Sequence, residues 1–342
     1  MITFKPKQVT KKMLAALPER ACDVLVKRYG LGDSAETRTL ESIGQMYGIT
    51  RERVRQIENY GIQSIQKSPI YKEFEPVFEE LRALIDSLGA VVSEEYLLGQ
   101  LANDVATRNH IYFLLVLGSP FSRNKENSAL RHRWYIEKKV ADTVEKALHN
   151  VFNSLADDEL VSEVEILNRL RTELSDIEER FDDTTIFQNW LQLSKNIGRN
   201  PLGEWGPSQS PNVRAKGIRD YAYLAVKRHG SPMHFKEVAQ VIEELFNRKA
   251  HVATTHNELI KDGRFVLVGR GLYALTEWGY TAGVVKDVLR DILVKHGPLT
   301  REEIIDRVRK ERYVKDNTII VNLQDNSLFK MTPDGQYIVL EN

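Results

Sequence analysis

Apolar residues in the N-terminal part of the chain recur at the three- and four-residue spacing of amphipathic helices. The spacing predicts three helices there, over residues 13–29, 40–47 and 51–66. The glycine-containing residues 30–33 are expected to end the first of them. Residues 1–12 are polar and basic and are expected to form a loose arm.

The second and third predicted helices are joined by a tight turn at Gly48-Ile49, and Thr39 and Thr50 are suited to cap them. Helix, turn and helix in this order are typical of a DNA-reading motif. In the third helix the inward side is formed by Val54, Ile57, Gly61 and Ile65. The opposite side is polar and is formed by Arg51, Glu52, Arg55 and Gln56.

The side chains on this outer side have the chemistry of major-groove readers. Arginine bonds N7 and O6 of guanine together, glutamine does the same for adenine, and glutamate accepts from N4 of cytosine. We therefore predict that Arg51, Glu52, Arg55 and Gln56 contact bases. The predicted DNA-binding set also contains Thr50, Arg53 and Lys67, and of these Arg53 and Lys67 are better placed for phosphate. The alternative interpretation is a solvated, charged helix face.

The stretch LPERACDVLVKRYGLGDSAETRTLESIGQMYGITRERVRQIE and the residues after it resemble region 4 of the sigma-70 family of bacterial transcription initiation factors, over about residues 13–81. The resemblance implies a recognition helix that binds the promoter −35 element, with the family's base contacts at positions 51, 52, 55 and 56. It also implies docking on the flap of the RNA polymerase β subunit.

Two features depart from the family pattern. Tyr60 and Gly61 stand where the family tends to have lysine and alanine, and a glycine inside a helix costs about 1 kcal/mol relative to alanine. In a full sigma factor this region also closes the chain, after segments that melt the promoter, and no aromatic-rich melting helix is found downstream here. An independent initiation factor is therefore not expected.

A second pattern repeats along the rest of the chain. Segments that begin at Leu84, Ala225 and Ile292 each combine a helix ended by glycine, a short extended link and a polar residue that opens a second helix. Paired apolar stretches around a turn follow at residues 121–136, 265–275 and 329–340. Three helices and a β-hairpin predict a winged helix each time. A weaker unit fits residues 139–211, with a reduced wing at 203–207 and a linker at 200–212.

Residues 214–281 also resemble the HARE-HTH winged helix, known from the δ subunit of bacterial RNA polymerase and from some chromatin-associated proteins. The resemblance is carried by LIKDGRF at residues 259–265 and GLYALTEW at residues 271–278. It implies a polymerase- or DNA-associated role and no particular reading residues. We therefore expect a mainly α-helical chain: a helix-turn-helix domain at 1–72 and winged-helix units at 73–138, 139–211, 212–282 and 283–342.

Charge is distributed unevenly although the net charge is zero. Residues 1–70 hold 12 Lys and Arg against 7 Asp and Glu, whereas residues 139–183 hold 5 against 13. The basic part can approach phosphate, and the acidic part is expected to face protein or solvent. The first predicted wing is also basic, so its possible DNA contacts are Arg123, Lys125, Arg131 and Arg133. In the alternative, the neighbouring Trp134 and Tyr135 are core residues and the basic side chains are solvated.

Several classes of function are disfavoured. Cys22 is the only cysteine, which excludes a disulfide framework and a cysteine-based zinc site and fits a reducing cytoplasm. Four histidines between residues 229 and 256 lack metal-ligand spacing, and no Walker motif or nucleophile elbow is present. We expect no enzyme activity, cofactor, metal site or small-molecule substrate. Without a signal peptide or membrane span, the protein is expected to be cytoplasmic and nucleoid-associated.

Together these patterns predict a DNA-binding transcription factor whose partners are double-stranded promoter DNA and the RNA polymerase core. The alternative is a δ-like protein that docks on the polymerase and reads no sequence. A third interpretation is a phage or mobile-element protein that remodels host transcription. The sequence does not choose between activation and repression.

Overall fold

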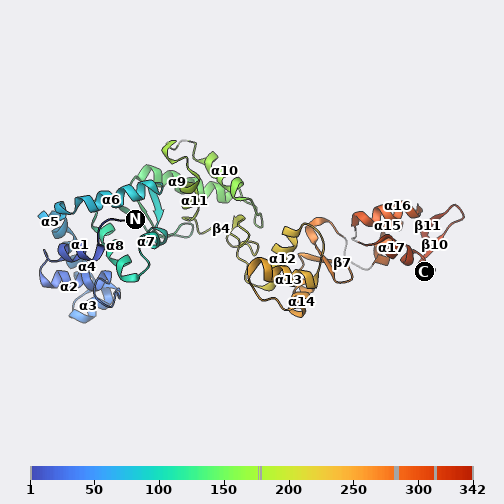
Figure 1. The fold of residues 1–342 in the computed structure, drawn as a ribbon, viewed down its shortest axis with the longest axis horizontal. Helices are drawn as coiled ribbons and strands as arrows, with labels where there is room; N and C mark the ends of the chain where they lie inside the picture. Colours follow the sequence, from blue (N-terminus) through green and yellow to red (C-terminus); the bar gives the residue numbers. More distant parts are fainter. Residues whose placement is uncertain (1, 176, 178, 281–284, 312–313, 341–342) are drawn as a thin grey trace. The chain divides into compact units, whose positions relative to one another are not determined.

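The computed structural model describes residues 2–175, 177, 179–280, 285–311 and 314–340. The chain forms two compact units, residues 1–198 with 205–208 and residues 199–204 with 209–342. Helices predominate and the strands form small antiparallel sheets, as the sequence predicted (Figure 1). Among the helices of the described residues, none is both long and apolar enough to cross a membrane.

The N-terminal helices follow the hydrophobic spacing, with two exceptions. Helices α3 (Leu40–Tyr47) and α4 (Arg51–Lys67) confirm the predicted helix-turn-helix. Helix α2 (Glu19–Tyr29) begins later than residue 13, because Pro18 caps its start and residues 15–17 form a turn. The expectation of a loose arm is wrong, because α1 spans Pro6–Leu14. Its apolar side is buried in a cluster with residues more than sixty positions later in the chain, and such distant contacts leave no local sequence signal.

The chain continues through the short helix α5 (Pro69–Glu73) into α6 (Glu75–Ser87), α7 (Glu94–Leu101) and α8 (Val105–Leu117). The strands β1 (Val91–Ser93), β2 (Ser122–Asn124) and β3 (Arg133–Tyr135) pair antiparallel in the order β1-β3-β2. Three helices and a hairpin sheet are consistent with the first predicted winged helix.

This small sheet has a hydrophobic core on each side, because neighbouring residues of a strand point to opposite faces. Val92 and Trp134 belong to a cluster that includes residues of α1, α2, α4, α6 and α8. Val91 belongs to the other cluster, and Tyr135 packs against it. The core alternative for Trp134 and Tyr135 is therefore confirmed, since Trp134 is only 2% exposed and Tyr135 is partly buried.

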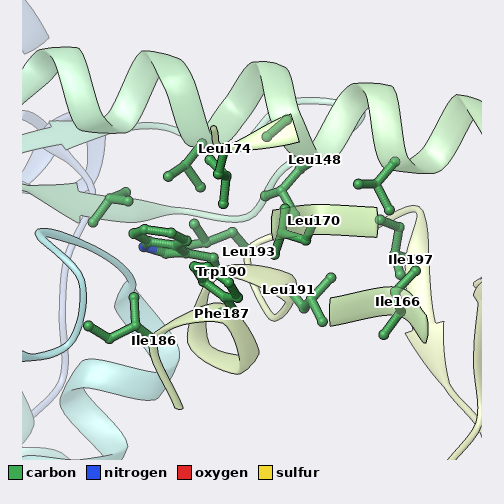
Figure 2. Packing of buried hydrophobic residues seen from close by; sticks show 14 of the residues in the cluster. Leu148, Ile166, Leu170, Leu174, Ile186, Phe187, Trp190, Leu191, Leu193 and Ile197 are labelled. Carbon is green, nitrogen blue, oxygen red and sulfur yellow. The ribbon is translucent and has the colours of Figure 1, made fainter. Parts of the chain in front are cut away.

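The second of these clusters belongs to the acidic segment. Helices α9 (Lys138–Asn153), α10 (Glu163–Glu173) and α11 (Thr184–Leu191), the turn η1 (Glu179–Phe181) and the hairpin of β4 (Ile197–Arg199) and β5 (Trp205–Pro207) surround it. Figure 2 shows Trp190 among the aliphatic side chains of this cluster, and its ring lies 5.6 Å from that of Phe187. The indole N–H of Trp190 donates to the carbonyl of Gly89 at 3.1 Å, which ties α11 to the turn before β1.

Helix α8 joins the first winged-helix-like unit to the helix-turn-helix. It lies against α1, α2 and α4 (Figure 1). Most of its apolar side chains are buried. The ring of Tyr29 packs on that of Phe113, with centroids 5.0 Å apart. The amide of Asn109 donates to the carbonyls of Gly30, at 3.1 Å, and Ala35, at 2.9 Å. Gly30 has a φ of 62°, and a Cβ there would lie 2.5 Å from the Asn109 amide, so only glycine fits.

The second compact unit contains the same arrangement twice. The first copy has α12 (Ile218–His229), α13 (Phe235–Phe246), α14 (Val252–Lys261), β6 (Met233–His234), β7 (Phe265–Gly269), β8 (Leu272–Leu275) and the turn η2 (Thr276–Trp278). The second has α15 (Val285–His296), α16 (Arg301–Glu311), α17 (Asp316–Leu323), β9 (Leu299–Thr300), β10 (Phe329–Met331) and β11 (Gln336–Val339). In both sheets, as in β1-β3-β2, the last strand lies between the first and the middle one.

Residues 200–212, expected to be a linker, have defined local structure. The side chain of Asn200 accepts the N–H groups of Leu202 and Glu204, at 2.9 Å each. Asn212 is 3% exposed and accepts a hydrogen bond from Arg264 at 3.1 Å. The Asn200 side chain therefore holds the turn at residues 202–204, and Asn212 connects the stretch to Arg264. The domain boundaries inferred from the sequence stay a prediction.

A buried hydrogen bond ties α1 to α8. Thr10 Oγ1 lies 2.6 Å from Nδ1 of His110, and both residues are buried. Burial, with a smaller effect of the Lys7 charge, lowers the pKa of His110 from its usual value of 6.5, and Asp104 opposes this shift. Below that value the unfolded chain binds more protons than the folded chain, so stability falls as the pH decreases.

We expect His110→Gln to remove this part of the pH dependence. Urea unfolding of the full chain from about pH 8 to about pH 5 should give a free energy of unfolding that falls less steeply in the variant than in the wild type. His149→Gln, at an exposed position of α9, is the control and should keep the wild-type slope. Equal slopes for the wild type and His110→Gln would show that this histidine does not contribute.

Candidate nucleic-acid interface

The turn between α3 and α4 is held by capping bonds and close backbone packing. Thr39 Oγ1 accepts from the N–H of Ser42 at 3.1 Å, and Thr50 Oγ1 accepts from that of Arg53 at 3.2 Å. Gly48 has a φ of 64°, a region that favours glycine. A Cβ on Gly44 would lie 2.6 Å from the carbonyl oxygen of Ile49, so the turn also requires glycine in α3. The capping predictions for both threonines are confirmed.

The inner side of α4 is close to the predicted one. Val54, Gly61 and Ile65 are buried, whereas Ile57 is half-buried against the small cluster of Val24, Ile43 and Val54. A Cβ on Gly61 would lie 3.0 Å from Leu25 Cδ1, which is tighter than an ordinary contact. Glycine, in place of the family's alanine, thus allows α4 to pack closely on α2 at this position.

Sequence reasoning missed one residue that holds α4 in place, the buried Glu58. Its carboxylate accepts a hydrogen bond from the hydroxyl of Tyr29 at 2.9 Å and one from Nε of Arg28 at 3.3 Å. Arg28 also donates to the carbonyl of Arg38 at 3.1 Å, next to the cap of α3. Burial first, and then the Glu58 charge, raise the pKa of Tyr29, so that its hydroxyl stays a donor. Glu58 lies four residues after Val54, and this helical spacing was the available signal.

The structure brings five of the predicted DNA contacts together on the exposed first turns of α4. These are Arg51, Glu52, Arg53, Arg55 and Gln56. Arg55 donates to both carboxylate oxygens of Glu52, at 2.7 and 2.9 Å, and Arg53 donates to Gln56 Oε1 at 3.0 Å. The hydrogen bond from Arg55 lowers the pKa of Glu52. Exposed pairs of this kind contribute little stability, so their groups can exchange partners for base edges at small cost.

The other two predicted contacts of the helix-turn-helix are placed differently. The side chain of Thr50 is used in the cap and so orients the start of α4. Lys67 is exposed at the opposite end of α4, sixteen residues after Arg51. At about 1.5 Å per residue the two positions are about 24 Å apart along the helix axis.

The four basic residues of the first wing are divided between the surface and internal ion pairs. Arg123 donates to both oxygens of Glu94, at 2.5 and 2.8 Å, and Glu94 also accepts from the indole N–H of Trp134. Arg133 is 3% exposed and donates to Glu145. The remaining two, Lys125 and Arg131, are exposed.

The part of the chain that the structure describes contains no group of three or more His, Cys, Asp or Glu residues that could hold a metal ion. In the histidine-rich segment, the ring of His256 stacks on that of Phe235 at 4.2 Å, and His234 packs near the same ring at 4.4 Å. These imidazoles therefore pack on Phe235.

Comparison with known proteins agrees with this geometry. Residues 13–67 match the family described as "Sigma-70, region 4". They form a sigma-70 region 4 domain. Domains of this family are DNA-binding modules with a helix-turn-helix for the promoter −35 element, and they generally bind promoter DNA and RNA polymerase.

Curated relatives of the chain include proteins named RNA polymerase sigma factor SigA. The protein from Nostoc sp. is 42% identical over 67 residues, which are 19% of this chain and 17% of that one. The protein from Listeria monocytogenes is 37% identical over 73 residues, 21% of this chain and 19% of the relative. The chain thus spans less than a fifth of the length of these relatives.

We expect Glu58→Gln to loosen the region 4 domain without removing a DNA contact. The variant keeps a partner for Tyr29 but loses the charge-assisted bond to Arg28, so the free energy of unfolding should fall by about 1 kcal/mol. Binding to different duplexes should weaken by a common factor, because Glu58 is buried and is not among the exposed side chains of α4.

Urea unfolding and fluorescence anisotropy with matched and scrambled duplexes measure the two effects. Glu41→Gln, an exposed glutamate of α3, is the control and should leave both unchanged. A stability equal to that of the control, or a loss confined to one duplex sequence, would contradict the positioning role of Glu58.

Proposed function

We propose that the chain is a DNA-binding transcription factor that acts at bacterial-type promoters. In this proposal Arg51, Glu52, Arg55 and Gln56 read a −35-like element, and the region 4 domain also contacts RNA polymerase core, with the β flap as the expected contact. No residue of the chain is assigned to promoter melting. The match of residues 13–67 to region 4 supports the promoter and polymerase assignment.

The observation that carries the proposal is the contrast between the two halves of α4. The first turns expose polar side chains whose donors and acceptors suit base edges. In the last turns, Ile65 is buried in the same cluster as residues of α8, and Gln66 donates to the carbonyl of Leu117 at 3.0 Å. The winged-helix-like unit thus covers an apolar side of the domain and leaves the polar side open, which favours DNA reading.

A second function is favoured by two exposed apolar side chains of the helix-turn-helix. Met46 of α3 is 50% exposed and Tyr60 of α4 is 56% exposed. Methionine and tyrosine are enriched at protein interfaces. In this alternative the chain is a δ-like protein associated with RNA polymerase, and its N-terminal domain docks on the polymerase without reading sequence.

The wing residues enter the proposal unequally. Lys125 and Arg131 are the exposed cations of the predicted set and serve as flanking phosphate contacts. Arg123 and Arg133 are already bonded to Glu94 and Glu145, and releasing them would leave carboxylates unpaired. We assign these two to the stability of the sheet.

The double variant Arg55→Ala/Gln56→Ala separates reading from docking. If the proposal holds, the preference for a −35-like duplex over a scrambled one should decrease by about 1–3 kcal/mol for each base contact that is lost. Competition binding of the full chain, measured by fluorescence anisotropy at fixed salt, gives this preference. Docking alone predicts no change in preference.

Arg82→Ala/Gln100→Ala is the matched control. Both residues are exposed, and Arg82 forms an i,i+3 ion pair with Glu79 as Arg55 does with Glu52. The control should keep the wild-type preference, and both double variants should be retained by immobilised RNA polymerase core. If the wild type shows no duplex preference and is not retained by the polymerase at moderate salt, the proposed function is wrong.

A further inference from the structure

The winged-helix-like units differ in the helix that would read DNA. Each unit is named here by its third helix, which gives the α8, α11, α14 and α17 units. In helix-turn-helix proteins, sequence is read by exposed side chains of this helix. α8 is covered by the region 4 domain. In α11 the side chains of Ile186, Phe187, Trp190 and Leu191 are themselves buried in the core. Of these four helices, as far as the described residues show, α14 and α17 are the ones with a side that is open within their own unit.

The open side of α14 has small and polar residues at its centre and cations at its ends. Ala253, Thr254 and Asn257 are exposed, followed by Ile260, which is 61% exposed. Small side chains permit close approach to a groove floor, asparagine bonds adenine with both amide atoms, and an apolar side chain can contact the thymine methyl group. α14 has ten residues, and an α-helix with its side chains is about 10–12 Å across, which fits a major groove about 12 Å wide.

Exposed cations stand at both ends of this helix. Lys249 lies in the turn before α14, and Lys261 is its last residue. Among the residues that the structure describes, no ion pair involves either lysine. Such cations are in place to neutralise phosphates on the two walls of one groove.

The wing of the same unit ends in a third exposed cation, Arg270, between Gly269 and Gly271. Gly271 has a φ of 70°, and a Cβ there would lie 2.6 Å from Nε2 of His234. Its carbonyl accepts the N–H of Phe235, the first residue of α13, at 2.9 Å. The hairpin tip is therefore narrow and fixed against the helix-turn-helix of the unit, as a wing that inserts an arginine into a minor groove requires.

The α17 unit has the same fold and a different surface. Asp316 at the start of α17 forms an ion pair with Arg309, and Val321 on its open side is 59% exposed. Its wing turn contains Asp334 instead of arginine. Residues 283–342 hold 10 Lys and Arg against 10 Asp and Glu, whereas residues 212–282 hold 11 against 7. The positive excess therefore belongs to the α14 unit.

We propose that the α14 unit is a second contact with double-stranded DNA. α14 enters a major groove with Asn257 toward the bases, Lys249 and Lys261 bind phosphates, and Arg270 of the wing reaches the adjacent minor groove. The charge complementarity favours DNA over a protein partner. This contact is independent of promoter reading by the region 4 domain.

The test uses the full chain and a random duplex of about 30 base pairs without a −35-like element. Removing three phosphate or groove contacts with Lys249→Ala/Lys261→Ala/Arg270→Ala should reduce the slope of log affinity against log salt by about 0.9 per contact. Lys310→Ala/Lys315→Ala/Lys330→Ala is the matched control, because it removes three exposed lysines of the α17 unit. The control should change the slope by less than the value of about 0.9 that is expected for one contact.

The same measurement is repeated in the Arg51→Ala/Arg55→Ala variant, which lacks two of the proposed base contacts of the region 4 domain. The result for the α14 unit then does not depend on whether the region 4 domain reads a promoter. Circular dichroism confirms that each variant is folded. A lower slope for the α14 triple variant alone supports the second contact. Equal slopes for the two triple variants overturn it. A loss of binding to RNA polymerase core with an unchanged slope also overturns it, and would assign the surface to protein.

Discussion

The packing of α8 on the region 4 domain is the contact on which the arrangement of the first compact unit depends. One side of α8 contributes Phe113 to the ring of Tyr29, and its polar residues Asn109 and His110 bond the end of α2 and the middle of α1. Buried hydrogen bonds of this kind are costly to leave unmade, so they fix one orientation of the helices. The region 4 domain and the first winged-helix-like unit therefore share one hydrophobic core.

This shared core decides which surface of the region 4 domain can meet a partner. The last turns of α4 are enclosed, and the first turns, with Arg55 and Gln56, are exposed. Glu58 stands at the border between the two, where its carboxylate connects α4 to α2 and, through Arg28, to the entry of α3. A protein partner that binds α4 therefore meets its exposed first turns or has to displace α8. The exposed Met46 and Tyr60 mark the first of these routes.

The repeated winged-helix-like arrangement is used for different purposes along the chain. The sheets around β3, β8 and β11 share one strand order, yet β1 and β3 are buried between two cores. In the α8 and α11 units the third helix contributes apolar volume, and the acidic charges of residues 139–183 are carried by one of these structural units. The α14 unit keeps an open third helix and a basic wing tip. One topology thus supplies both internal support and external surface, and the difference lies in which side chains the third helix carries.

The sequence determined the elements whose signals are local. Threonine caps, the Gly48 turn, the amphipathic faces of α4 and the glycine-ended helices of the repeats follow from spacing and backbone preference, and the region 4 resemblance follows from one continuous stretch. Tertiary structure decided what depends on distant residues: that residues 6–14 form a helix on α8, that Glu58 is buried, that Trp134 is core, and that Arg123 and Arg133 face carboxylates instead of solvent. The sequence does not show whether a basic side chain binds a phosphate or a glutamate. Only the folded chain shows which carboxylates lie close enough to pair with it.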